Sequence, residues 1–226
     1  MVKKLSRMVI LLCIVVTPAW AQYESSGLGF KGGLNFANIA IDPEPDDGFE
    51  TYLRFGGGLS MMFSVNPNLA FDLDALYMMK GAKREYRSGN DLEDNTITYK
   101  TELDYITLSP MLRIIPMPGG GGPYILAGAE FGYLVRAKAK SDAGSTENSN
   151  ETDIKDDLKD IDIGINLGGG MQFPLGDEGK SFFVEAHYVH GLQEINEDPS
   201  EDELRVLGED YTWKNRAFYV FAGIRL

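Results

Sequence analysis

The amino-acid sequence predicts an all-β fold, an eight-stranded antiparallel up-and-down transmembrane β-barrel. Three observations predict it: hydrophobic and polar residues alternate with period two in eight segments, the connections between these segments are alternately short and long, and the chain begins like an exported protein. We expect a signal peptide over residues 1–21, cleaved after Sec-dependent export, and an integral outer-membrane barrel domain over residues 22–226. The expected location is the bacterial outer membrane.

The first residues have the three parts of a secretory signal peptide. A basic start, a nine-residue apolar run and an A-x-A cleavage motif follow one another as Lys3, Lys4 and Arg7, then residues 8–16, then Ala19-Trp20-Ala21. The apolar run is far shorter than the roughly 20 residues of a membrane-spanning helix. The single cysteine, Cys13, lies in this segment, so the mature chain has no thiol for a disulfide or an iron–sulfur cluster, and we expect no cofactor.

Eight later segments alternate as β-strands do when one face is apolar and the other polar. In chain order they are residues 27–38, 52–65, 69–80, 100–114, 123–137, 160–173, 181–191 and 215–226. One apolar residue from each segment, in the same order, is Leu34, Phe55, Phe71, Leu108, Phe131, Ile165, Val184 and Val220. The fourth segment is the least regular, because Leu103 and Met111 fall on its polar face and Pro110 interrupts its hydrogen-bond ladder.

The connections alternate strictly between two kinds. Residues 66–68, 115–122 and 174–180 are compact and rich in the residues of turns. The other four connections are long: residues 39–51, 81–99, 138–159 and 192–214. These four carry a net charge of −14, while the chain without its three basic signal-peptide residues carries −16 (−13 for the whole chain). Because outer-membrane barrels have short periplasmic turns and long outer loops, we expect four long acidic loops at the outer end.

The charges on the polar faces indicate which face lines the interior. An eight-stranded barrel is just wide enough for side chains to fill it, and buried charges must be paired. The polar faces carry six cations and five anions: Lys31, Arg54, Lys80, Arg113, Arg136 and Arg225, against Asp72, Asp74, Glu130, Asp162 and Glu185. We predict that these eleven form an ionic network that plugs the lumen, with the apolar faces against lipid. The alternative is a soluble ligand-binding β-barrel with its apolar faces inside.

Several segments resemble the PorT-like outer-membrane β-barrel domain family, which consists of small outer-membrane proteins of Bacteroidota. The segments are residues 29–38, 73–81, 103–112, 162–164 with 168–170, and 215–216. The resemblance implies an eight-stranded barrel with both termini in the periplasm, and it suggests protein secretion, the process of the component after which the family is named. It implies no catalytic residue. The final strand ends in Leu226, whereas the barrel-assembly machinery usually reads an aromatic residue there.

The remaining features argue against nucleic-acid binding, a metal site and catalysis. The strongly negative charge argues against a nucleic-acid partner, whose phosphates require Lys and Arg. The acidic runs 42–47 and 197–203 lack the spacing of a calcium loop, so we expect no metal site. His187 and His190 have no serine within two residues, which leaves an outer-membrane lipid-modifying enzyme as the weaker alternative. We expect no enzyme.

The sequence favours a structural or interaction protein of a secretion or envelope complex, because long loops on a rigid scaffold commonly carry binding sites. Loops 138–159 and 192–214 are the expected site of a protein partner. The other expected partners are outer-membrane lipid, lipopolysaccharide and, during insertion, the barrel-assembly machinery.

Overall fold

The computed structural model describes residues 27–42, 50–87, 96–117, 119, 121–143, 150–176, 179–196 and 212–226. The predicted signal peptide lies outside the described residues, as do the acidic segments 43–49 and 197–211. Within the described ranges, no helix has the length and hydropathy needed to cross a membrane.

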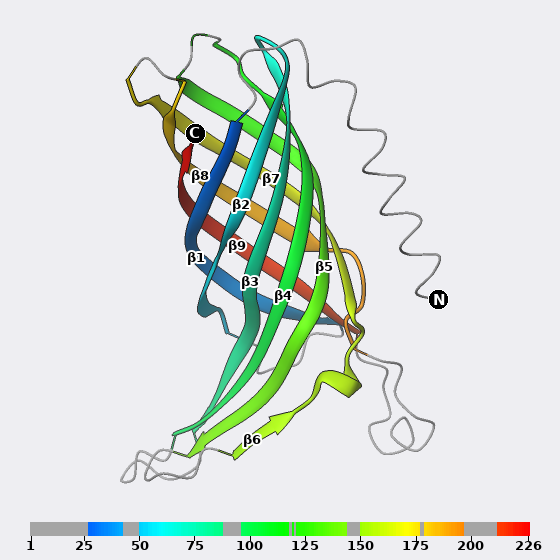
Figure 1. The fold of residues 1–226 in the computed structure, drawn as a ribbon. Helices are drawn as coiled ribbons and strands as arrows, with labels where there is room; N and C mark the ends of the chain where they lie inside the picture. The colour runs from blue at the N-terminus through cyan, green and yellow to red at the C-terminus, as the bar shows by residue number, and fades with distance from the viewer. Residues whose placement is uncertain are drawn as a thin grey trace.

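Eight antiparallel strands form a closed barrel, which confirms the predicted fold (Figure 1). The described elements are β1 (Gly27–Asp42), β2 (Tyr52–Asn66), β3 (Leu69–Arg87), β4 (Thr96–Ile114), β5 (Gly122–Ala143), β6 (Asn150–Asp153), the short 3₁₀ helix η2 (Lys155–Asp157), β7 (Ile161–Pro174), β8 (Ser181–Gly191) and β9 (Thr212–Arg225). Each barrel strand pairs with its neighbour in the chain, and β1 pairs with β9 to close the wall. The additional strand β6 pairs only with β5.

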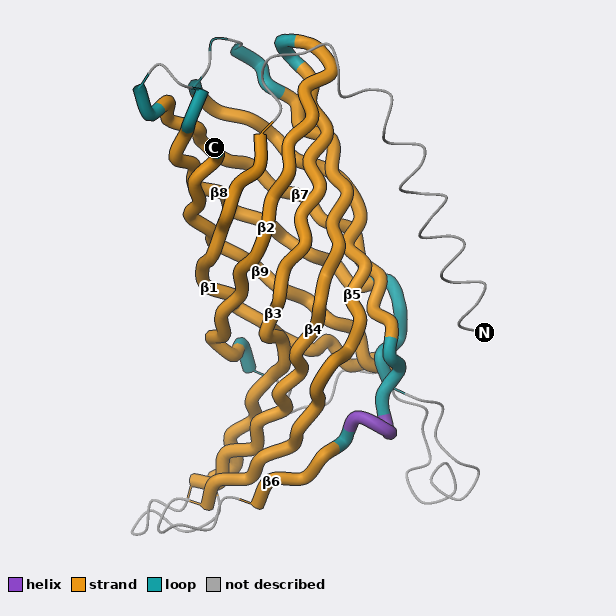
Figure 2. Tube along the Cα trace, viewed as in Figure 1, coloured by secondary structure: helices purple, strands orange, loops and turns teal. Residues whose placement is uncertain are grey.

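The two ends of the barrel differ. Pro67 and Asn68 form the turn between β2 and β3, and the other two turns at this end are also short. Gly27 and Leu226, the first and last described residues, lie at the same end, since Leu226 N donates to Leu28 O at 2.9 Å. Figure 2 shows turns and loops gathered at the two ends of the tilted wall. By the rule that short turns are periplasmic, the opposite end is the outer one.

At the outer end three strands continue past the closed wall, where the sequence had predicted loops. β3 runs to Arg87, β4 begins at Thr96 and β5 runs to Ala143, with β6 along its edge (Figure 1). The predicted loops 81–99 and 138–159 are therefore partly strands. Period-two reasoning missed them because a sheet that stands clear of the membrane has no lipid face, so its residues show no apolar alternation. We call the outer parts of β3, β4 and β5, with β6, the outer extension (residues 81–87, 96–104, 136–143 and 150–153).

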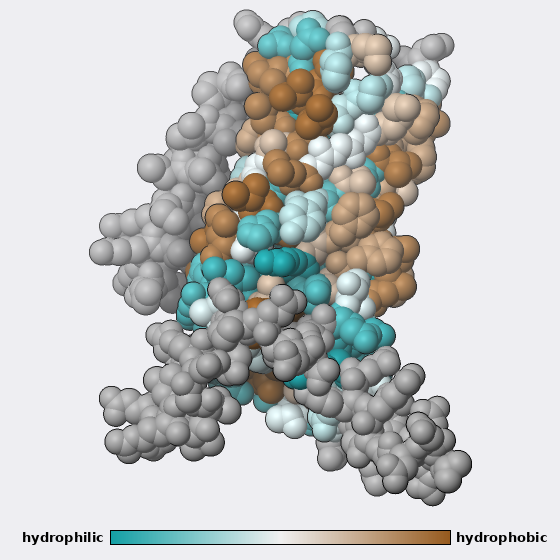
Figure 3. All heavy atoms as spheres, turned by 180° about the vertical axis from the view of Figure 1, so that it is seen from behind, coloured by the Kyte–Doolittle hydropathy of each residue, from teal (hydrophilic) through white to brown (hydrophobic). Residues whose placement is uncertain are grey.

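The apolar faces point outward and the polar faces inward. Leu34 and Phe71, which would line a soluble ligand-binding barrel, are each 38% exposed on the outside. In Figure 3 hydrophobic side chains cover much of the wall and hydrophilic ones gather toward the end that carries the extension. Leu103 and Met111, the two irregular positions of the fourth predicted strand, are buried on the inner face. The two positions looked irregular because the interior contains apolar side chains as well as polar ones.

Arg136 is a correction to the predicted interior set. In the β4–β5 ladder Tyr105 pairs with Leu134, but Asp104 pairs with Arg136, which leaves Val135 as an extra residue in β5. Such a bulge shifts the alternation by one position. Leu134 before the bulge is buried, and the Arg136 side chain after it is 44% exposed. Regular alternation would have turned Arg136 inward, and one inserted residue turned it out.

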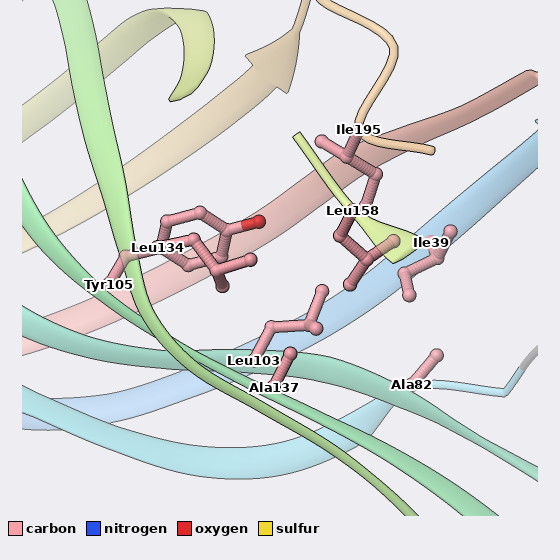
Figure 4. Close-up of a cluster of buried hydrophobic side chains, with 8 residues drawn as sticks. All are labelled: Ile39, Ala82, Leu103, Tyr105, Leu134, Ala137, Leu158 and Ile195. Carbon is pink, nitrogen blue, oxygen red and sulfur yellow. The ribbon is translucent and has the colours of Figure 1, made fainter. Parts of the chain in front are cut away.

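Apolar clusters lie at both ends of the interior. The outer cluster joins side chains of β1, β3, β4 and β5 to two from the connections before β7 and β9 (Figure 4): Ile39, Ala82, Leu103, Tyr105, Leu134, Ala137, Leu158 and Ile195. The two connections are tied together, because Lys159 N donates to Ile195 O at 2.8 Å and Ile195 N donates to Trp213 O at 2.8 Å. Met111, Tyr124 and Leu126 form the smaller cluster near the short turns.

Candidate functional site: buried charges and the outer extension

The first group of buried charges lies in the half of the barrel nearer the short turns. Lys31 donates from β1 to Asp74 at 2.5 Å and to Glu185 at 2.8 Å, so one ammonium joins β3 and β8 across the interior. Arg113 donates through Nε to both oxygens of Asp72 at 3.0 Å and through Nη2 to Glu185 at 3.2 Å. Two cations, from β1 and β4, thus bridge three carboxylates from β3 and β8.

Small residues make room for this group. A Cβ on Gly170 would lie 2.5 Å from the Tyr124 ring, whose hydroxyl donates to Glu185 at 2.8 Å. A Cβ on Gly168 would lie 2.7 Å from His187 Nδ1. Glycine is therefore needed where β7 passes these two rings, because any larger residue would displace them.

The second group lies nearer the outer end and centres on one lysine. Lys80 donates to Glu130 at 2.8 Å and to Asp162 at 3.0 Å, and all three residues are at most 3% exposed. Tyr219 donates to Glu130 at 3.1 Å, and Asn215 donates to Asp162 at 2.9 Å. Two carboxylates therefore share a single ammonium, and Tyr219 and Asn215 each add one neutral donor.

A third group ties β2 to the base of the outer extension. The β2–β3 ladder ends at the pair Gly56 and Met78. Beyond that point Arg54 reaches β4, where it lies 2.9 Å from Glu102 and 3.0 Å from Asp104. These ion pairs, together with the backbone hydrogen bonds between Glu50 and Lys83, hold the extension to the outer end of β2 beyond the β2–β3 ladder.

The structure buries ten of the eleven predicted network residues and brings them together in these three groups. Arg225, the last of the ten, donates to Gln172 at 3.0 Å and lies 3.9 Å from Asp72. Arg136 is the exception, since its exposed side chain lies 3.4 Å from Asp104 on the outside.

Sequence reasoning missed several residues that hold the groups together. Glu102 and Asp104 lie in the register of β4 whose other residues face lipid. The signal for them is that two charged residues in this register indicate where the lipid-facing part of β4 ends. Tyr124, Asn215 and Tyr219 lie in the polar-face register of their strands, so their side chains point inward. Although they carry no charge, each donates a hydrogen bond to a buried carboxylate. Counting charges alone could not find these neutral donors.

The two histidines have different surroundings. His187 is buried, with Nδ1 3.0 Å from Asn166 Oδ1 and Nε2 3.1 Å from Glu185 Oε2, so neither ring nitrogen contacts a hydroxyl in the described part of the chain. His190 is exposed on the outer face of β8. No group of three or more His, Cys, Asp or Glu side chains among the described residues is arranged to hold a metal ion.

Comparisons with known proteins give one family match. The model of the outer membrane protein beta-barrel domain matches residues 20–197. No curated protein matches the chain.

Three of the similar solved structures are small barrels. OprG from Pseudomonas aeruginosa has a TM-score of 0.46 and 12% identity, over 90% of this chain and 97% of that one. Neisserial surface protein A has a TM-score of 0.44 and 12% identity, over 90% and 99%. Ail, the attachment invasion locus protein of Yersinia pestis, has a TM-score of 0.41 and 16% identity, over 90% and 100%.

Proposed function

Because the chain belongs to the outer membrane protein β-barrel domain family and is a protein of the bacterial outer membrane, we propose that it is a structural or interaction protein of the cell envelope. In this proposal the interior is plugged, and the outer extension binds a protein partner. The finer placement among PorT-like proteins rests on the ordered sequence segments described above, and it would make a secretion complex the setting.

The plugged interior is supported by the packing of charged and apolar side chains across it. Ten ionisable side chains cross the space inside eight strands, and the outer cluster around Leu158 and Ile195 lies beyond them. Aqueous channels occur in barrels of about 16 strands, not eight. The role therefore does not involve the passage of solutes.

The full chain in a planar lipid bilayer is expected to give no resolved single-channel steps, because paired charges and apolar side chains leave no continuous water path. Single-channel recording checks this, with a 16-stranded porin as the positive control. Discrete, reproducible conductance steps from the purified barrel would refute the plugged interior.

The single observation that carries the interaction role is the outer extension. β3 and β4 pair from Leu69 and Ile114 as far as Arg87 and Thr96, well past the last β2–β3 pair. A membrane anchor alone has no need of this additional sheet, whose backbone is already ordered by its own ladders. A preordered surface binds at a lower entropic cost than a flexible loop does.

The extension can be shortened without disturbing the wall. Lys83 and Lys100 are opposite one another in the β3–β4 ladder, so replacing residues 84–99 with Asn-Gly allows a two-residue hairpin turn between them. We expect this variant to insert and fold, but to lose the proteins that cross-link to and co-purify with the full chain from solubilised outer membranes. The matched control replaces Pro67 and Asn68, at the periplasmic end, with Asn-Gly. Unchanged partners in the shortened variant would contradict the proposal.

A further inference from the structure

Beyond the bulge at Val135, the outer face of β5 changes abruptly from apolar to basic. Phe131 and Tyr133, 44% and 49% exposed, are its last apolar positions before the bulge. The exposed side chain of Arg136 follows directly on the same outer face, with Lys138 after it. Aromatic side chains mark the membrane–water boundary of outer-membrane barrels, so Arg136 lies at the level of the lipid headgroups.

A second cation lies near Tyr133. β6 pairs Asp153 with Lys138, and Ile154 N then donates to Ala137 O at 3.2 Å. Lys155, the next residue, begins η2 directly after this hydrogen bond. The Lys155 ammonium lies 5.8 Å from the centre of the Tyr133 ring. The exposed Tyr133 ring therefore has the Lys155 ammonium near it, and Arg136 follows three positions later on β5.

Neither of these two cations has an acidic partner of its own among the described residues. Asp104 is shared between Arg136 and Arg54. Lys155 makes no ion pair within the described part of the chain, where its charge contacts only the Tyr133 ring. Lys138, in contrast, pairs with Glu151.

We propose that Arg136 and Lys155, above Tyr133, form a binding site for the phosphate of an outer-leaflet lipid headgroup. The occupant is a lipid because the site continues the lipid-facing side of the wall: acyl chains against Phe131 and Tyr133 place a headgroup at the two cations. Guanidinium groups bind phosphate through two parallel hydrogen bonds, and an ammonium adds a point charge. The site is separate from the partner-binding role proposed above and does not depend on it.

The test uses the full chain in detergent micelles, titrated with lipid A that carries its phosphates or with lipid A from which they have been removed. Native mass spectrometry reports the fraction of protein that retains lipid. We expect the phosphorylated form to bind more tightly, and the double variant R136Q/K155Q to weaken that binding by about tenfold or more, because two charge-assisted contacts are lost. Binding of dephosphorylated lipid A should not change.

The matched control is K214Q/R216Q, which removes two cations from the outer end of β9, next to the exposed Phe218. It should retain phosphorylated lipid A as the unmodified chain does, and both variants should migrate as folded barrels on unheated gels. Equal losses in the two variants would show a general attraction of charge and overturn the site. So would unchanged binding in R136Q/K155Q, or full displacement of lipid A by an excess of inorganic phosphate.

Discussion

Replacing Lys80 with Met is expected to prevent stable folding of the barrel. Among the described residues the ammonium is the only cation that contacts Glu130 and Asp162, and both carboxylates are buried. Breaking a buried ion pair costs about 3–5 kcal/mol because the remaining charge is uncompensated, and here two carboxylates lose their partner at once. A loss of this size is comparable to the whole stability of a typical domain, about 5–15 kcal/mol. Heat-modifiable migration on gels and urea unfolding in detergent would measure it.

Two further variants separate charge from packing at this position. K80M/E130Q/D162N removes all three charges and should recover folding, because no unpaired charge is then left inside. K180M, at an exposed position in the short turn before β8, should behave as the unmodified chain does. If K80M folds as stably as the unmodified protein, the ionic group around Lys80 does not hold the wall together.

The second large effect is expected at Arg113. R113M should destabilise the barrel by about 3 kcal/mol or more, since Asp72 loses its two-pronged partner and Glu185 loses one of its donors. The loss should be smaller than for K80M, because Arg225 lies 3.9 Å from Asp72 and Lys31 still contacts Glu185. Urea unfolding midpoints in detergent give the comparison.

A conservative variant distinguishes the two roles of the guanidinium. R113K keeps the charge but cannot donate both hydrogen bonds to Asp72 in a fixed plane, so its stability should fall between those of R113M and the unmodified chain. The double variant D72N/R113M measures the coupling between the partners. An R113K barrel no more stable than R113M would mean that packing, and not charge, determines the effect.

The wall of the barrel could be predicted from the sequence because its physics is local. Each strand meets lipid on one side and a narrow interior on the other, so Leu34, Phe71 and their counterparts must alternate with polar residues. The near balance of charges on the polar faces placed ten of eleven residues inside for the same reason. For the outward positions the constraint is contact with lipid, and for the inward positions it is the narrow interior. Each constraint acts on every second residue of every strand.

Arg136 and the outer extension could not be predicted, because neither leaves a mark on that alternation. Because Val135 is one extra residue in β5, the side chains after it point to the opposite face from the one that regular alternation predicts. Nothing in the Val135 side chain distinguishes it from its neighbours. The extension lies beyond the lipid-facing wall, so lipid does not require an apolar residue at every second position there. Residues 81–87 and 96–99 therefore have the mixed composition of a loop while pairing as strands.

The outer apolar cluster has a consequence for the order in which the chain assembles. Ile39 comes from the first strand and Ile195 from the connection that leads to the last, so the cluster that contains both closes most of the chain into one loop. The entropy of that closure is recovered only when β1 and β9 lie side by side. We therefore expect the outer cluster to form late in assembly. A chain halted before β1 pairs with β9 would still expose the apolar side chains of this cluster to water.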